Sequence, residues 1–98
     1  MEWPSRSFAS REVEEFFITE AVPRRAGWSR MATVAKRKLD MLDYADRLDD
    51  LRSPPGNRLE ALKHSLAGLH SIRINDQWRV VFRWTDAGPA EVDIVDYY

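Results

Sequence analysis

The clearest alternation of apolar and polar residues in the chain runs from 71 to 84. Successive side chains of a strand point to opposite faces, so this segment predicts two strands that share an apolar face. That face consists of Ile72, Ile74, Trp78, Val80, Phe82 and Trp84. Asn75-Asp76 separates the two runs, a pattern that predicts a tight antiparallel hairpin. The opposite face would carry Arg73, Arg79 and Arg83 close together, which makes it the first place to look for function.

Apolar residues at helical spacing predict two helices upstream, from about Arg11 to Glu20 and from about Ser29 to Tyr44. Ser10 is a favourable N-cap for the first helix, and Pro23 stops its continuation. Two antiparallel helices with a short joint form a hairpin that packs over one face of a sheet. The basic run Lys36-Arg37-Lys38 would lie on the outside of the second helix, either solvated or against a nucleic acid or a partner.

Further elements flank these helices and the predicted strand hairpin. An edge strand is expected at Ser5–Phe8, and a short helical turn at Asp46–Leu51. The segment Ser53–Gly56 then separates the helical half from the strand half. Strands are expected at Arg58–His64, before the hairpin, and at Ala90–Tyr97, after it. The predicted order is βααβββ, or ααβββ without the first strand: an α+β fold with a helical hairpin on one face of a small antiparallel sheet.

Composition narrows the class of protein. The 98 residues suffice for a single domain, 1–98, and 44% of them are apolar and 32% charged, as in ordinary globular domains. The absence of cysteine excludes a disulfide framework and a thiolate metal site. The sequence starts without the features of a signal peptide and has no membrane-length apolar run. We therefore expect a soluble cytoplasmic protein without membrane association, cofactor or metal.

The charge is distributed unevenly although the net charge is only −1. Residues 58–84 contain five basic and two acidic side chains, whereas residues 85–98 contain four acidic and no basic ones. A basic patch next to an acidic strand is suited to binding a polyanion with carboxylates close by. The same distribution also arises when neighbouring strands pair their charges across a sheet. Charge alone leaves both interpretations open.

Three segments carry a resemblance to a known family. These are Leu-Glu-Ala-Leu-Lys at 59–63, Ser-Ile-Arg-Ile-Asn-Asp-Gln-Trp-Arg-Val-Val-Phe-Arg-Trp at 71–84, and Val-Asp-Tyr followed by an aromatic residue at 95–98. With them the chain resembles the HigB family of the RelE/ParE superfamily, over essentially its whole length. The resemblance implies a RelE-like fold and the toxin of a bacterial toxin–antitoxin module. It further implies a ribosome-dependent endoribonuclease that cuts messenger RNA and inhibits translation. The implied partners are the ribosome, mRNA and a helix-turn-helix antitoxin, HigA, through which the pair binds operator DNA.

Metal-independent RNA cleavage needs a base for the 2′-hydroxyl proton, cations for the charged phosphorane and an acid for the leaving 5′-oxygen. Arginine and lysine in the hairpin region suit the phosphate. The candidate phosphate-binding residues are Lys63, Arg73, Arg79 and Arg83. The candidates for proton transfer are Glu60, Asp96, Tyr97, Tyr98, His64 and His70. Each histidine could equally be structural, and the two together do not make a metal site.

The resemblance assigns some of these residues by position. Lys63 aligns with the family's strand lysine, and Arg73 and Arg79 align with its hairpin arginines. The candidate catalytic set is therefore Glu60, Lys63, Arg79, Asp96, Tyr97 and Tyr98. The chain departs from the family in two places: Tyr98 stands where many relatives end in histidine, and Glu60-Ala61 stands where relatives often read His-Pro. His64 could replace a family histidine from a shifted position.

Two other functions remain open at this stage. One is a catalytically weak binding module that pairs with a helix-turn-helix antitoxin through the same fold. The other is a toxin of the same superfamily that acts on another target, such as DNA gyrase.

Overall fold

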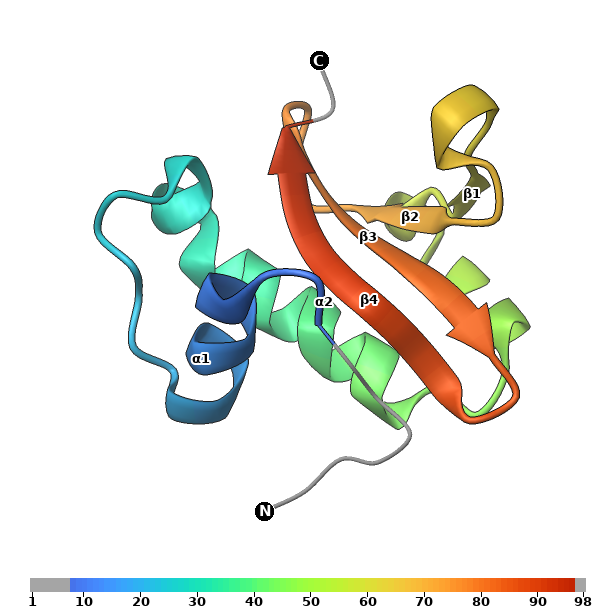
Figure 1. Ribbon diagram of the computed structural model, residues 1–98, viewed down its shortest axis with the longest axis horizontal. Helices are drawn as coiled ribbons and strands as arrows, with labels where there is room; N and C mark the ends of the chain where they lie inside the picture. Colours follow the sequence, from blue (N-terminus) through green and yellow to red (C-terminus); the bar gives the residue numbers. More distant parts are fainter. Residues whose placement is uncertain (1–7, 97–98) are drawn as a thin grey trace.

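The computed structural model describes residues 8–96, in which two helices precede a four-stranded antiparallel sheet (Figure 1). The helices are α1 (Arg11–Thr19) and α2 (Ala32–Tyr44), and the strands are β1 (Glu60–Ala61), β2 (His70–Arg73), β3 (Trp78–Thr85) and β4 (Gly88–Asp96). The strands lie in the order β1-β2-β3-β4. The α+β fold is confirmed, and the four strands correspond to the four strand segments expected after the helices, although the order βααβββ counts only three of them. No helix among the described residues is long and apolar enough to cross a bilayer.

The predicted first strand falls mostly outside the described residues, which include only Phe8 of Ser5–Phe8. Phe8 forms an isolated parallel bridge with Val92 in β4, and the amide of Ala9 donates to the carbonyl of Val92 at 2.9 Å. Phe8 and Ala9 therefore lie beside β4, immediately before α1 begins.

Helix α1 starts as its N-cap predicts, because the amide of Val13 donates to the hydroxyl of Ser10. Glu20 ends it in a left-handed conformation, φ 63°, with its amide donating to the carbonyl of Phe16. The predicted second helix begins later than Ser29, since Gly27–Met31 form a 3₁₀ helix. This segment is fixed from two sides. Trp28 packs on Phe16 at 4.9 Å between ring centroids, and a β-carbon added at Gly27 would lie 2.4 Å from the indole of Trp78.

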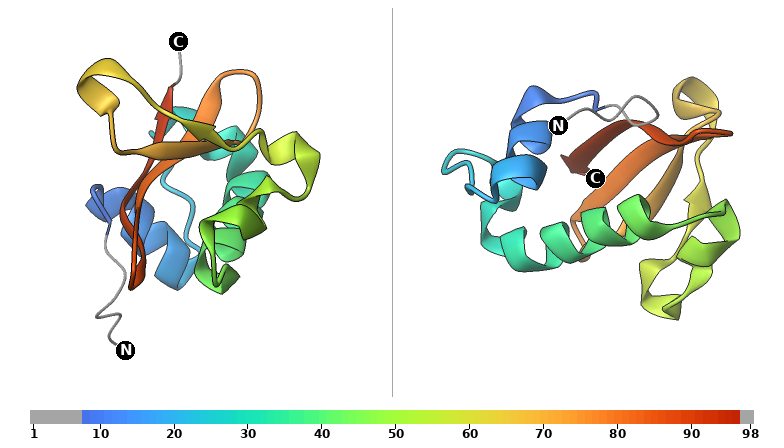
Figure 2. Two further views of the ribbon diagram at one scale, coloured as in Figure 1. Left: turned by 90° about the vertical axis from the view of Figure 1, so that its right-hand side faces the viewer. Right: turned by 90° about the horizontal axis from the view of Figure 1, so that it is seen from below.

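The helices and the sheet enclose one hydrophobic core. Helix α2 crosses β3 and β4, and α1 packs against β4 (Figures 1 and 2). The buried core comprises Val13, Phe16, Phe17, Trp28, Ala35, Leu39, Leu42, Leu51, Ile72, Ile74, Val80, Phe82, Val92 and Ile94. The apolar face predicted for the hairpin is therefore confirmed as the core face, with Trp78 and Trp84 half-buried at its margin. The basic run on α2 does not form one solvated face, because Lys38 is buried.

The predicted tight hairpin is confirmed, with a loop one residue longer than Asn75-Asp76. The amide of Ile74 donates to the carbonyl of Trp78, so the loop between the paired residues contains three residues, 75–77. Asn75 Oδ1 accepts from the amides of Gln77 and Trp78 at 2.9 and 2.7 Å. This side-chain turn replaces the backbone turn expected from Asn75-Asp76. Arg73 consequently pairs with Arg79, and both lie on the face opposite the core.

Strand β1 is shorter than predicted, since only Glu60–Ala61 of Arg58–His64 pair, with Ser71 and His70. Two residues with positive φ limit the strand: Arg58 at 47° and His64 at 58°. Arg58 follows a 3₁₀ helix, and His64 starts another, so the extended pattern is interrupted at both ends. The amide of Leu62 still donates to the carbonyl of Leu69, which closes the β1–β2 connection.

Strand β4 shifts register by one residue along β3. Val81 is opposite Asp93, whereas Arg83 is opposite Ala90. The extra residue lies near Glu91, which has φ 54°. Such a bulge changes the twist of a strand without ending its pairing. The last residues of the predicted strand Ala90–Tyr97 are described only as far as Asp96.

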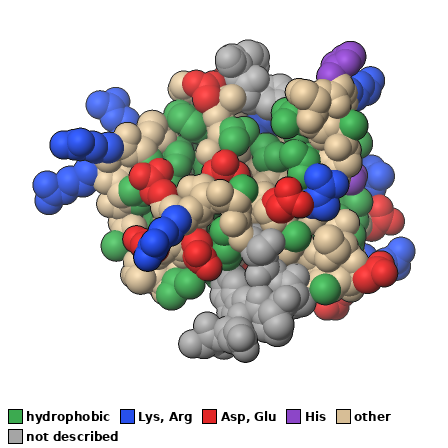
Figure 3. Space-filling model, viewed as in Figure 1, with side chains coloured by type: hydrophobic (Ala, Val, Ile, Leu, Met, Phe, Trp, Pro, Cys, Tyr) green, Lys and Arg blue, Asp and Glu red, His purple; other side chains and the backbone are tan. Residues whose placement is uncertain are grey.

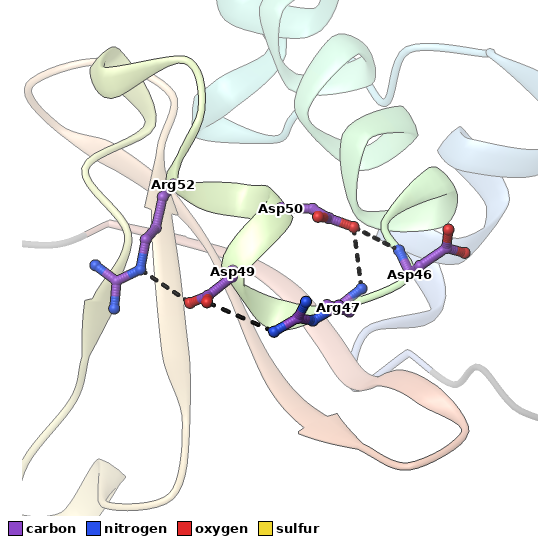
Figure 4. Close-up of polar contacts among 5 residues, drawn as sticks. All are labelled: Asp46, Arg47, Asp49, Asp50 and Arg52. Carbon is purple, nitrogen blue, oxygen red and sulfur yellow. Dashed lines mark hydrogen bonds and ion pairs between the residues drawn. The ribbon is translucent and has the colours of Figure 1, made fainter.

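The turn after α2 is held by short-range polar contacts (Figure 4). Asp50 accepts from the amides of Asp46 and Arg47 at 3.0 and 3.1 Å, and Asp49 pairs with Arg52 at 3.0 Å. These contacts support the 3₁₀ helix at 48–52, close to the helical turn expected at Asp46–Leu51. They direct the chain from the end of α2 toward β1.

A buried polar contact joins α2 to the segment before β1. Asn57 is 0% exposed, and its amide nitrogen donates to the carbonyls of Leu51 and Ser53. Its side-chain oxygen accepts from Lys38 Nζ at 2.5 Å. Burial lowers the pKa of Lys38, and the nearby Arg37 and Arg73 lower it further. The contact fixes the start of the strand half relative to α2.

Candidate nucleic-acid interface and cleavage site

Three of the candidate polar residues lie together on β1 and the connection that follows it. Glu60, Lys63 and His64 line an open groove of about 440 Å³. The remaining lining residues are Ala61, Leu62 and Leu66. The groove therefore combines a carboxylate, an ammonium and an imidazole with an apolar wall.

Lys63 is positioned by the backbone rather than by side-chain contacts. It is the N-cap residue of the 3₁₀ helix His64–Leu66, with extended φ and ψ of −126° and 175°. Its side chain is exposed and forms no ion pair within residues 8–96. The ammonium is thus available to an anion that enters the groove.

Arg79 lies on the face opposite the core, as predicted, but it is only 7% exposed. Its Nε donates to Ser71 Oγ at 2.8 Å, and its Nη2 donates to the carbonyl of Arg58 at 2.6 Å. The guanidinium therefore ties β3 to β2 and to the residues just before β1. The Arg58 carbonyl that Arg79 contacts lies two residues before Glu60.

The two other hairpin arginines are held by carboxylates. Arg73 pairs with Asp76 in the hairpin loop at 2.5 Å, and its side chain is one-third exposed. Arg83 pairs with Glu91 at 2.8 Å. A β-carbon at Gly68 would lie 2.8 Å from Arg83 Nη1, so the arginine lies directly against the β1–β2 connection. Arg83 is thereby close to the segment that carries the groove.

Of the C-terminal candidates, only Asp96 is described, since Tyr97 and Tyr98 lie outside residues 8–96. Asp96 accepts from Gln77 Nε2 at 2.9 Å and is opposite Trp78. Strand β4 forms the edge of the sheet opposite to β1. The structure therefore does not bring Asp96 into the groove with Glu60 and Lys63.

His70 belongs to the core side of the sheet rather than to the groove. It is opposite Phe82, and the two rings are stacked with centroids 6.2 Å apart. Its Nδ1 is buried and has no hydrogen-bond partner among residues 8–96. This histidine is used for packing.

The sequence did not indicate that Asp93 has a carboxyl with a perturbed pKa. Burial raises the pKa of its carboxyl, although the hydrogen bond from the Ile94 amide at 2.8 Å acts in the opposite direction. Asp93 is opposite Val81 on the face away from the core. The sequence contains one indication of this burial: Asp93 lies between the apolar residues Val92 and Ile94 of β4.

A second group of basic side chains lies on the α1–α2 connection. Lys and Arg side chains project in a group at the side of the α1–α2 connection (Figures 1 and 3), which contains the exposed Arg24 and Arg25. No carboxylate or histidine lies between residues 21 and 39. Within residues 8–96 no group of three or more histidine, cysteine or acidic residues could hold a metal ion.

Comparisons with known proteins define the class. A family profile described as the RelE-like toxin of the type II toxin–antitoxin system HigB matches residues 6–98. This match, with the two helices and the antiparallel sheet, places the chain among the RelE-like toxins. The chain belongs to the HigB family, which confirms the resemblance seen in its sequence. As a type II toxin, it has a cognate antitoxin as its partner.

The chain is also similar to individual proteins. The chain is 54% identical over 79 residues to Toxin HigB-1 of Vibrio cholerae serotype O1, covering 81% of this chain and 82% of that protein. It is 41% identical over 56 residues to an uncharacterized protein of Haemophilus influenzae, covering 57% and 55% respectively. Among solved structures, a YoeB/ParE toxin from Agrobacterium tumefaciens is similar with a TM-score of 0.46 and 26% identity, over 72% of this chain and 83% of that one.

Proposed function

We propose that this toxin is a metal-independent endoribonuclease that cuts messenger RNA on the translating ribosome and so inhibits translation. The main support is the groove in which Glu60, Lys63 and His64 meet. An ionised carboxylate accepts a proton, and an ammonium stabilises a phosphate that gains charge in the transition state. Family membership supports the same function.

The proposed reaction is the attack of a 2′-oxygen on the adjacent phosphorus. Glu60 takes the proton from the 2′-hydroxyl, and the new O–P bond forms as the P–O5′ bond breaks. The products are a 2′,3′-cyclic phosphate and a 5′-hydroxyl end, once the 5′-oxygen has gained a proton. Lys63 would contact the non-bridging phosphate oxygens, and Arg73 and Arg83 would contact the neighbouring backbone.

Arg79 enters this proposal as a positioning residue. Its contacts with Ser71 and the Arg58 carbonyl hold the strands that carry Glu60. Asp96, Tyr97 and Tyr98 remain candidates for contacts with the message or for proton transfer from the other edge of the sheet. Tyrosine suits stacking on an unpaired base.

For the partner we propose a HigA-like helix-turn-helix antitoxin, through which the complex would contact operator DNA. The proposed site of action is the cytoplasm, where ribosomes translate. The second candidate function is a catalytically weak module that only binds this antitoxin. The burial of Arg79 favours it, because an arginine with protein partners has fewer donors left for RNA.

Cleavage of a message on purified, programmed ribosomes tests the proposal. We expect the wild-type protein to cut within the translated region and Lys63→Ala to be slower by about 100-fold or more, as for loss of one charge-stabilising group. Arg37→Ala is the matched control, since it removes an exposed cation from α2 and should leave the rate unchanged. Cleavage by Lys63→Ala at the wild-type rate contradicts the assigned site. A wild-type protein that binds its antitoxin but never cuts favours the binding module.

A further inference from the structure

His64 has a backbone conformation that needs an explanation. Its φ is 58°, in the left-handed region that disfavours residues with a β-carbon by about 1–2 kcal/mol. Histidine tolerates this region better than most residues, but glycine fits it without strain. Residues in such conformations concentrate at functional sites, where the strain is offset by what the side chain does.

The other left-handed non-glycine residues have structural roles. Glu20 caps α1, the carbonyl of Arg58 accepts from Arg79, and Glu91 pairs with Arg83. The side chain of His64, in contrast, makes no hydrogen bond, ion pair or ring contact within residues 8–96. It is exposed in the groove. Packing therefore does not account for a histidine at this position.

The groove supplies the chemistry for which an imidazole is suited. The charged groups that line it with His64 are Glu60 and Lys63. Cleavage of RNA needs two proton transfers, one from the 2′-oxygen and one to the 5′-oxygen. A carboxylate can only accept a proton, whereas an imidazolium donates one near neutral pH. The two groups thus divide the two steps between them.

We propose that His64 is the general acid of the reaction and protonates the leaving 5′-oxygen. This inference rests on the proposed function and completes its proton balance. Glu60 gains the 2′-hydroxyl proton as the O–P bond forms, and His64 loses its proton to the 5′-oxygen as the P–O5′ bond breaks. Exchange with water afterwards returns both side chains to their starting states.

The test compares two messages on programmed ribosomes under single-turnover conditions. One is ordinary RNA, and the other carries sulfur in place of the bridging 5′-oxygen at the cleavage site. A thiolate is a far better leaving group than an alkoxide because a thiol has a much lower pKa, so the second message needs no general acid. The variant is His64→Gly, since glycine keeps the left-handed backbone. Glu20→Gly is the matched control, because it also replaces a left-handed residue (φ 63°) by glycine, here at the end of α1.

We expect His64→Gly to cut the ordinary message about 100-fold or more slowly, and the sulfur message at close to the wild-type rate. Added imidazole should restore part of the lost rate. Glu20→Gly should cut both messages like the wild type. Equal slowing of both messages by His64→Gly would indicate a structural role and overturn the proposal. So would a wild-type rate on the ordinary message. If the wild type cuts neither message, the proposed function fails and this role fails with it.

Discussion

The buried contact between Lys38 and Asn57 leads to a stability prediction in which the effect of Lys38→Met depends on whether Asn57 is present. In Asn57→Ala, the ammonium of Lys38 loses its only acceptor among residues 8–96, and the carbonyl of Leu51 loses the Asn57 donor. Lys38 is only 8% exposed, so water does not readily replace the lost oxygen. The variant should therefore be destabilised far more than a surface substitution.

The magnitude follows from the groups left without partners. Each buried polar group without a partner costs about 1–3 kcal/mol, and a buried charge that loses its partner costs about 3–5 kcal/mol. We expect Asn57→Ala to lower the free energy of unfolding by about 3–5 kcal/mol. A typical domain has about 5–15 kcal/mol in total, so the variant should stay folded but with a small margin.

Lys38→Met should act in opposite directions in two backgrounds. In the wild type it leaves Asn57 Oδ1 buried without a donor, so stability stays about equal or falls by about 1–2 kcal/mol. In Asn57→Ala it removes the unpaired ammonium and keeps most of the side-chain volume, so stability rises by about 1–3 kcal/mol. Urea unfolding of the four proteins gives the coupling energy. Arg30→Met is the control, since it removes an exposed cation from the 3₁₀ helix just before α2.

The pH dependence follows from the lowered pKa of Lys38, whose ordinary value is 10.5. Between the lowered pKa and 10.5 the unfolded chain binds more protons than the folded protein. The Lys38 contribution to stability therefore rises with pH through this window. Lys38→Met should remove that rise. A coupling energy below about 0.5 kcal/mol, or an unchanged pH profile in Lys38→Met, would refute the reasoning.

Two more predictions concern packing and a buried carboxyl. Gly27→Ala should lower the free energy of unfolding by about 1–3 kcal/mol and alter tryptophan fluorescence, because the new methyl group would collide with Trp78; Gly56→Ala, where nothing lies within 4 Å, should show neither effect. Asp93→Asn should raise stability at pH 7 but not at pH 3 in urea unfolding. Burial raises the Asp93 pKa above its ordinary 3.8, so the wild type loses stability as pH rises through the raised value. Equal effects at both pH values would contradict this.

The sequence was informative where one short-range rule governs the structure. Period-two alternation correctly separated the core residue Val80 from Arg79, and the N-cap of α1 was correctly placed at Ser10. Of the candidate site, the proximity of Glu60 and Lys63 was recovered because they are three residues apart around the end of one strand.

The predictions that were wrong or incomplete depend on contacts and conformations that a local sequence pattern does not reveal. The short β1 results from left-handed residues at Arg58 and His64, which are not glycines and so give no signal. The three-residue loop results from the side chain of Asn75. Alternation assigns Arg79 to a face but does not say how much of that face is covered, and the burial of Arg79 depends on acceptors in two other segments.

The bulge near Glu91 has a consequence for insertions and deletions in this strand. Pro89, Val92 and Ile94 are buried, and the first spacing is three residues instead of two. Loss of one residue at position 91 would restore regular alternation, with the same three side chains still facing inward. A shorter β4 would thus keep the core but lose the carboxylate that holds Arg83. A sequence that lacks this one residue is therefore compatible with the same fold and differs in the freedom of a single guanidinium group beside the groove.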